Sequence, residues 1–182
     1  MSNFLKDFYN IPNRECIGEY LNKYNLNKII CEIGVNAGNN FLHLLKTAHP
    51  ILFYGIDIWT DQNSKTSNED LDKFYKNLKQ IESVNSHIKI IKKFSINASM
   101  GFPDNFFDFI YIDADHTYES VKEDINAWWP KIKMNGILSG HDYKRKRGCG
   151  VLGAVDEFKS TNKIQHFHIT PERCSSWMFF KI

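Results

Sequence analysis

Two apolar stretches of this chain end abruptly at acids and histidines. Residues 107–112 (Phe-Asp-Phe-Ile-Tyr-Ile) have the length and composition of a buried strand, and they lead directly into Asp-Ala-Asp-His at residues 113–116. Residues 137–139 form a second apolar strand, which leads through a glycine into His-Asp at residues 141–142. In open α/β sheets, ligands bind at the carboxyl ends of neighbouring parallel strands. The two strand ends therefore predict an α/β sheet with a functional site at one edge.

The rest of the chain alternates between short apolar strands and amphipathic helices. This alternation implies right-handed crossovers and a parallel sheet covered by helices on both faces. No helix separates the last two strands, so we expect them to pair as an antiparallel hairpin near the edge of the sheet. The predicted strands are residues 28–33, 51–56, 87–91, 107–112, 137–139, 164–169 and 177–182, and the predicted helices are residues 17–24, 41–45, 71–81, 121–132 and 151–158.

Length and composition indicate one globular domain over residues 1–182, with an N-terminal helical segment at 1–26. A chain of 182 residues that is 42% hydrophobic can bury a sizeable core. Its net charge of +2 gives no bulk attraction to nucleic acid or to anionic membranes. No stretch is apolar and long enough for a membrane span or a secretory signal. The four cysteines are scattered, as in reduced proteins, so we expect a cytoplasmic protein.

The first predicted strand ends at a loop with two glycines, Gly34 and Gly38, which lets backbone approach a ligand closely. The spacing is not the dinucleotide fingerprint, because Asn36 stands where a second glycine would be. Asp57 ends the second strand roughly 20 residues further on, where an acid commonly binds ribose hydroxyls. The alternative is that Asp57 caps the next helix. Together the features favour a ligand that carries adenosine without a pyrophosphate.

Five segments occur in this order along the chain: EIGVNAG at 32–38, YGIDIW at 54–59, IDADHTY at 112–118, GHDY at 140–143 and GVLGAVDEF at 150–158. In these segments the chain resembles class I S-adenosylmethionine-dependent methyltransferases. More narrowly, the chain resembles the small metal-dependent O-methyltransferases related to the macrolide-sugar and catechol enzymes, from about Lys28 onward. The resemblance implies a Rossmann-like α/β fold with a seven-stranded, mostly parallel sheet whose last strand is antiparallel.

The resemblance also assigns roles to individual residues. The cofactor, S-adenosyl-L-methionine, would be held at its methionine end, its ribose and its adenine by Glu32, Gly34, Gly38, Asp57, Trp59, Ser95 and Asp113. A divalent cation, Mg²⁺ or alternatively Mn²⁺, would be held by Asp113, His141 and Asp142. His116 matches the position of the catalytic base, and Asp113 would take part in catalysis. Some relatives carry an acid where this chain has His141.

The chemistry of methyl transfer explains why these residue types are needed. The methyl group is already activated on a sulfonium, so the enzyme must mainly align and activate the acceptor. A neutral hydroxyl is a poor nucleophile; a cation can polarise it and a histidine can take its proton. Two carboxylates plus substrate hydroxyls suit Mg²⁺, whereas a histidine ligand shifts the preference toward a transition metal. The expected acceptor is a small hydroxylated molecule, such as a sugar.

Several residues have simpler alternatives. Asp115 is interpreted as the cap of the helix that starts near Thr117, and His116 could merely pack on its first turn. The basic run at residues 144–147 is either a solvated loop or a lid over an anionic acceptor. Acceptor recognition would rest on the N-terminal helices, the loop at 60–70, the basic loop or another subunit of a homo-oligomer.

Two other functions remain open at this stage. His116, His141 and Asp142 could form the two-histidine, one-carboxylate site of a non-haem iron oxygenase. That function would leave Asp57 and the glycine loop unexplained. A non-catalytic S-adenosylmethionine-binding protein is the second alternative, because a fold alone never proves catalysis.

Overall fold

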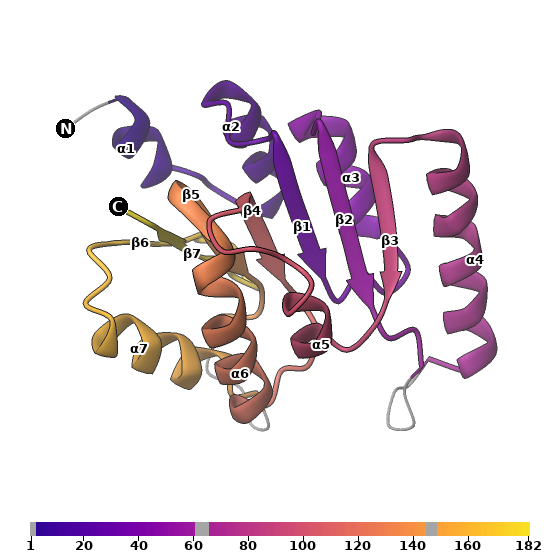
Figure 1. Cartoon of the computed structure of the whole chain (residues 1–182). Helices are drawn as coiled ribbons and strands as arrows, with labels where there is room; N and C mark the ends of the chain where they lie inside the picture. Colours follow the sequence, from indigo (N-terminus) through magenta and orange to yellow (C-terminus); the bar gives the residue numbers. More distant parts are fainter. Residues whose placement is uncertain (1–2, 61–65, 145–148) are drawn as a thin grey trace.

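The computed structural model describes residues 3–60, 66–144 and 149–182, which fold around one sheet (Figure 1). Its strands are Ile29–Ile33 (β1), Leu52–Asp57 (β2), Ile88–Lys92 (β3), Phe107–Ile112 (β4), Ile132–Gly140 (β5), His166–Ile169 (β6) and Trp177–Phe180 (β7). Its helices are Asn3–Phe8 (α1), Ile17–Lys23 (α2), Asn39–Ala48 (α3), Asn68–Val84 (α4), Ser95–Ser99 (α5), Tyr118–Trp128 (α6) and Val151–Thr161 (α7), with 3₁₀ turns at Arg14–Cys16 (η1) and Trp129–Lys131 (η2). None of these helices is long and apolar enough to cross a membrane.

The strand order is β3-β2-β1-β4-β5-β7-β6. The strands from β3 to β5 are parallel, and β7 runs antiparallel to both of its neighbours. This confirms the predicted seven-stranded, mostly parallel sheet with a reversed last strand. From β1 the chain moves outward to β2 and β3, and then returns to the other side of β1 with β4. The order of the strands therefore reverses between β1 and β4, the position where such sheets bind ligands.

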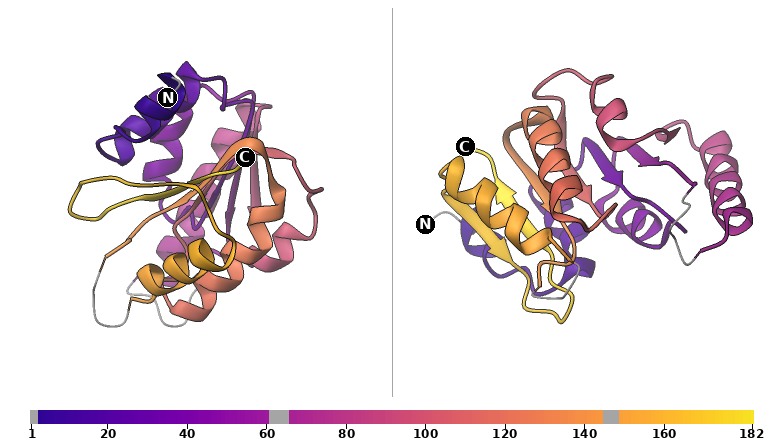
Figure 2. Two further views of the ribbon diagram at one scale, coloured as in Figure 1. Left: turned by 90° about the vertical axis from the view of Figure 1, so that its left-hand side faces the viewer. Right: turned by 90° about the horizontal axis from the view of Figure 1, so that it is seen from below.

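Helices cover both faces of the sheet, as predicted (Figures 1 and 2). Successive strand side chains point to opposite faces, so Ile30 joins a core with α1 to α4 while Cys31 joins a second core with α5 to α7. On β4, Phe109 joins the first of these cores and Ile110 joins the second. Because the central strands are apolar on both faces, each side chain is buried against a helix layer.

The boundary between the fourth helix pattern and the fifth strand differs from the prediction. The pattern predicts a helix to residue 132 and a strand only from residue 137, whereas α6 ends at Trp128 and β5 begins at Ile132. Pro130 lies in the 3₁₀ turn between them, since proline cannot continue an α-helix. The early part of β5 is paired through an irregular register, in which Ile132 lies opposite Phe107. Tertiary pairing extended this strand beyond its apolar run.

Candidate active site

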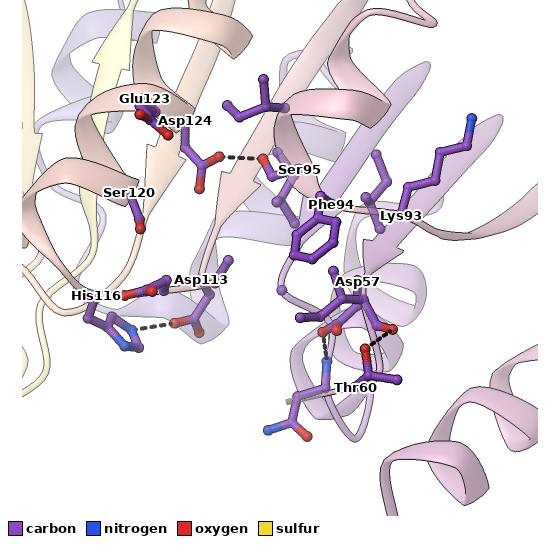
Figure 3. A pocket seen from close by; sticks show the side chains of 18 of the residues that line it. Asp57, Thr60, Lys93, Phe94, Ser95, Asp113, His116, Ser120, Glu123 and Asp124 are labelled. Carbon is purple, nitrogen blue, oxygen red and sulfur yellow. Dashed lines mark hydrogen bonds and ion pairs between the residues drawn. The ribbon is translucent and has the colours of Figure 1, made fainter. Parts of the chain in front are cut away.

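A cavity of about 660 Å³ lies at the carboxyl ends of β1, β2, β3 and β4 (Figure 3). That volume lies within the range of small-molecule and cofactor sites. Four of the residues that are predicted to bind the cofactor lie in the wall of this cavity. His116, the predicted base, lies there as well. The described residues that line it are Ile33, Gly34, Asn36, Ile56, Asp57, Ile58, Thr60, Leu71, Lys93, Phe94, Ser95, Ile96, Asp113, Ala114, Asp115, His116, Ser120, Glu123 and Asp124.

Gly34 brings the ends of three strands together. Its φ of +85° is in the left-handed region, and its N–H donates to the carbonyl oxygen of Ile56 at 2.8 Å. A Cβ at this position would lie 2.2 Å from the carbonyl oxygen of Asp113. The N–H of Asp113 in turn donates to the carbonyl oxygen of Ile33 at 2.8 Å. The close approach of β1, β2 and β4 at the cavity therefore requires glycine here.

Asp57 ties the first loop to the end of β2. Its Oδ2 accepts a hydrogen bond from the N–H of Asn36 at 2.8 Å, and its Oδ1 accepts one from the N–H of Trp59 at 2.7 Å. It does not cap the next helix, because α4 starts after Ser67, whose side chain accepts from the N–H of Asp70. The helix-cap alternative for Asp57 is therefore wrong. A carboxylate has about four acceptor sites, so both oxygens keep capacity for ligand hydroxyls.

Three predicted cofactor residues are outside the cavity wall. Trp59 is buried, and its indole N–H donates to the carbonyl oxygen of Asn36 at 3.0 Å, so it supports the loop from behind. Gly38 is the N-cap of α3, with a φ of +87°. Glu32 is 1% exposed, and its Oε2 has no hydrogen-bond partner among the described residues. Burial raises the pKa of Glu32 well above its ordinary value.

The cavity wall also contains the carboxylate of Asp124, which the sequence analysis did not select. Asp124 is 4% exposed and its Oδ1 accepts a hydrogen bond from the hydroxyl of Ser95. The indole N–H of Trp128 donates to the same hydroxyl oxygen at 2.9 Å. Burial raises the pKa of Asp124 to about 6. A signal was present, since this acid lies on the apolar face of α6 with Val121 and Ile125.

The pKa of Asp124 leads to a prediction about stability. In the folded protein the carboxyl group of Asp124 stays protonated up to about pH 6, whereas in the unfolded chain it loses its proton near pH 3.8. The wild type therefore loses roughly 3 kcal/mol of unfolding free energy as the pH rises through this interval. The neutral variant Asp124→Asn escapes that loss. Urea unfolding at about pH 4 and about pH 8 should show the variant gaining up to roughly 3 kcal/mol relative to wild type; a pH-independent difference would contradict this.

The predicted catalytic and metal-binding residues converge at the ends of β4 and β5. The Nε2 atom of His116 lies 3.3 Å from Asp113 Oδ1 and 3.2 Å from Asp142 Oδ2. The Nδ1 atom of His141 lies 3.7 Å from Asp113 Oδ1 and 3.9 Å from Asp142 Oδ1. The hydrogen bond with Asp113, helped by the charges of nearby carboxylates, raises the pKa of His116 above its ordinary value of 6.5. We call these four residues the catalytic cluster.

Two cations contact the carboxylates of the catalytic cluster. The guanidinium of Arg14, on η1, lies 3.6 Å from Asp113 Oδ2, and the ammonium of Lys144 donates to Asp142 Oδ1. No local sequence pattern indicated Arg14, because its contact joins positions about 100 residues apart in the chain. Within residues 3–60, 66–144 and 149–182, no group of three or more histidine, cysteine or acidic side chains is arranged to hold a metal ion.

Asp115 has a different role from the predicted helix cap. The N-cap of α6 is Thr117, whose side chain accepts from the N–H of Ser120. Asp115 Oδ1 accepts from the N–H of Thr117 at 2.7 Å, so it stabilises the turn before the helix. The rest of the basic run, residues 145–147, and the central part of the loop at 60–70, residues 61–65, lie outside the described residues.

A sheet with a glycine loop, a strand-terminal acid and a cavity at its switch point defines a Rossmann-like protein that binds a nucleoside-bearing ligand. Comparison with protein families makes this more specific. The family model described as a methyltransferase domain matches residues 31–143, well over half of the chain. The protein therefore belongs to this methyltransferase family. No curated protein matches its sequence.

Solved structures share the fold at low sequence identity. The O-methyltransferase NovP superposes with a TM-score of 0.66 and 16% identity, covering 97% of this chain and 78% of NovP. S-adenosylhomocysteine-bound PaMTH1 from Podospora anserina has a TM-score of 0.66 and 13% identity, covering 100% and 89%. SMU.1697c from Streptococcus mutans, also in complex with S-adenosylhomocysteine, has a TM-score of 0.62 and 14% identity, covering 86% and 89%. The family and these neighbours support S-adenosylmethionine as the cofactor.

Proposed function

We propose that this methyltransferase transfers the methyl group of S-adenosylmethionine to a hydroxyl oxygen of a small molecule, with assistance from a divalent cation. The observation that carries the proposal is the position of the catalytic cluster. Asp113 and His116 line the same cavity as Asp57, so a proton acceptor lies beside the site expected for the cofactor. The NovP likeness is consistent with an oxygen as the methyl acceptor.

The residues around the cavity fit the cofactor. Asp57 keeps acceptor capacity for the ribose hydroxyls. The buried Oε2 of Glu32 has no hydrogen-bond partner in the described structure, and an ammonium group at the methionine end would satisfy it directly or through water. The backbone of Gly34 lines the cavity without a side chain and leaves room between these groups.

His116 would act as the general base. The hydrogen bond with Asp113 raises the pKa of His116, which strengthens it as a proton acceptor. Asp113 and Asp142 both lie within hydrogen-bonding range of its Nε2 atom and would orient the ring. Orientation of the acceptor oxygen toward the sulfonium methyl would supply most of the remaining rate enhancement.

A divalent cation would bind to the carboxylates of Asp113 and Asp142, with His141 as the third candidate ligand. It would supply positive charge that lowers the pKa of the acceptor hydroxyl. Arg14 and Lys144 now contact these carboxylates, so a cation would have to compete with both. The proposal therefore includes displacement of at least one of these side chains when the cation binds.

The acceptor is proposed to be a small hydroxylated molecule, such as a sugar. Arg14 and Lys144 lie beside the catalytic cluster, and their positive charges would suit an acceptor that carries an anionic group. Family membership argues against the iron oxygenase alternative, whereas a non-catalytic cofactor binder is an outcome that the experiment must distinguish.

The test combines binding with turnover. Calorimetric titration should give saturable binding of both S-adenosylmethionine and S-adenosylhomocysteine. A panel of sugars, phosphorylated sugars and catechols should then be incubated with S-adenosylmethionine and with Mg²⁺, Mn²⁺ or a chelator. We expect a methylated product that requires a cation and is identified by mass spectrometry as an ether. Binding without any product would favour a non-catalytic binder, and turnover in the presence of chelator would remove the cation from the mechanism.

A further inference from the structure

Two side-chain cations lie beside the catalytic cluster without lining the cofactor cavity. Arg14 lies 3.6 Å from Asp113 Oδ2, and Lys144 donates to Asp142 Oδ1. Their side chains are 31% and 27% exposed, so a ligand can reach both. Asp113 and His116 line the cavity (Figure 3), whereas Arg14 and Lys144 are not among the described residues of its wall. A group of the methyl acceptor that extends past the cluster would therefore meet these two cations.

Arg14 is held in place by the segment between β6 and β7, residues 170–176. Its backbone N–H donates to Glu172 Oε1 at 2.8 Å. The hydroxyl of Thr170, which is fully buried, donates to the same oxygen at 3.0 Å. The guanidinium also contacts the hydroxyl of the buried Tyr111. An arginine fixed in this way loses little further conformational freedom when it binds a ligand.

The same segment contacts Lys144, whose Nζ atom lies 3.2 Å from Cys174 Sγ. A guanidinium and an ammonium only donate hydrogen bonds, and each has more N–H donors than its described contacts use. The ligand group that complements the pair is therefore an anion with several acceptor oxygens.

The charge balance of the catalytic cluster indicates which anion fits. In the structure Arg14 and Lys144 balance the carboxylates of Asp113 and Asp142. The proposed divalent cation would take over both carboxylates and would leave about two positive charges in excess at a partly buried position, which is unfavourable. A phosphate monoester carries close to two negative charges at neutral pH and has oxygens on several sides. A carboxylate would supply only half of that charge.

We propose that the methyl acceptor is a phosphorylated small molecule, whose phosphate group binds to Arg14 and Lys144 when the cation occupies the carboxylates of the catalytic cluster. Arg14 would bind the phosphate through its planar fork, and Lys144 would bind it as a point charge. The proposal names the acceptor class of the proposed function and rests on that function, including its divalent cation. The cation and the phosphate should therefore strengthen each other's binding by the same factor.

The test uses inorganic phosphate as the probe, because the acceptor itself is not needed for binding. Wild type is titrated with phosphate by calorimetry in the presence of S-adenosylhomocysteine, with and without saturating Mg²⁺. We expect Mg²⁺ to tighten phosphate binding at least about tenfold, within the usual range of coupling between two sites. Acetate at the same ionic strength should bind far more weakly, since it carries a single negative charge.

Substitutions of Arg14 connect this binding to the proposed residue. Arg14→Gln should weaken phosphate binding in Mg²⁺ at least about tenfold, as for other lost charge-assisted contacts. Arg14→Lys should keep part of the affinity, because lysine retains the charge and loses the planar fork. In turnover, wild type should methylate phosphorylated sugars at a lower KM than the parent sugars. Arg14→Gln should remove that difference while its affinity for S-adenosylhomocysteine stays near wild type.

The matched control is Arg173→Gln, which removes the same charge from the segment between β6 and β7. Arg173 is exposed and contacts neither carboxylate of the catalytic cluster in the described structure, so phosphate affinity should stay within about twofold of wild type. Circular dichroism verifies that all variants are folded, and a parallel titration measures Mg²⁺ binding.

Three results would overturn the proposal: no phosphate binding although Mg²⁺ is bound, acetate binding as tight as phosphate binding, or equal phosphate affinity in wild type and Arg14→Gln. A wild type that binds no Mg²⁺ would instead overturn the cation of the proposed function, and this proposal with it.

Discussion

Gly34→Ala is expected to abolish binding of S-adenosylhomocysteine. The added methyl group would lie 2.2 Å from the carbonyl oxygen of Asp113 and 2.6 Å from the Cα of Ala114. These are backbone atoms, so no side-chain rotation relieves the clash. The φ of +85° adds strain for any residue with a Cβ. Either β1 and β4 move apart at the cavity or the loop changes conformation, and both changes displace Asp113 from the first loop.

The measurement is calorimetric titration together with chemical denaturation. We expect no detectable heat of binding and a loss of several kcal/mol of unfolding free energy, as for other overpacked and strained sites (about 1–3 kcal/mol for each). Gly153→Ala is the matched control, because Gly153 lies within α7 and its added Cβ would meet Tyr118 only at ordinary contact distance, 3.4 Å. The control should bind normally and be slightly more stable. Normal binding by Gly34→Ala would show that the strand ends are not held as described.

Asp142→Asn is expected to reduce methyl transfer by about a hundredfold or more, while S-adenosylhomocysteine binding stays near wild type. Asp142 contacts His116 and Lys144 and does not line the large cavity in the described structure. Its φ of +57° favours asparagine over alanine as the substitution, because asparagine tolerates the left-handed region. The variant removes the charge and keeps the shape.

This experiment has a readout that does not need the acceptor. Titration with Mn²⁺ should give binding to wild type in the presence of S-adenosylhomocysteine, and that binding should be lost in Asp142→Asn. Asp115→Asn is the control, since Asp115 lies in the same loop region as Asp113 but accepts from the N–H of Thr117 and forms no ion pair among the described residues. Full turnover by Asp142→Asn would remove this carboxylate from the mechanism, and equal Mn²⁺ binding by both proteins would remove it from the proposed cation site.

The sheet could be predicted because its strands carry strong local signals. The parallel strands are apolar on both faces, since helices cover both, and each ends at a turn or a charge. The length of β5 was underestimated because residues 132–136 include exposed and turn-forming side chains, among them Met134 and Asn135. Ile132 pairs with Phe107 of β4, and Asn135 and Gly136 exchange backbone hydrogen bonds with Lys181, just beyond β7. No local pattern records these long-range contacts.

The candidate site also contains residues that the sequence predicted and residues that it missed. Asp113, His116, His141 and Asp142 were selected from sequence because each follows a strand, and parallel strands end at a common edge. Arg14 escaped selection, because its contact with Asp113 joins η1 to the end of β4, far away in the sequence. Trp59 was predicted to bind the cofactor near its ribose, but its side chain is buried behind the first loop and does not line the cavity.

The sequence by itself determined the order of the strands and longer helices along the chain, the reversed final strand, the glycine loop and the acids at strand ends. It missed the short helix α5. The predicted features depend on local periodicity and turn chemistry. Only the tertiary structure decided which of these groups share a cavity, which are buried behind it, and which cations contact the carboxylates. It also brought Ser95 and Asp124 together from α5 and α6. The physical reason is that hydrogen bonding, burial and pKa shifts depend on distances between segments, and those distances exist only after the sheet has assembled.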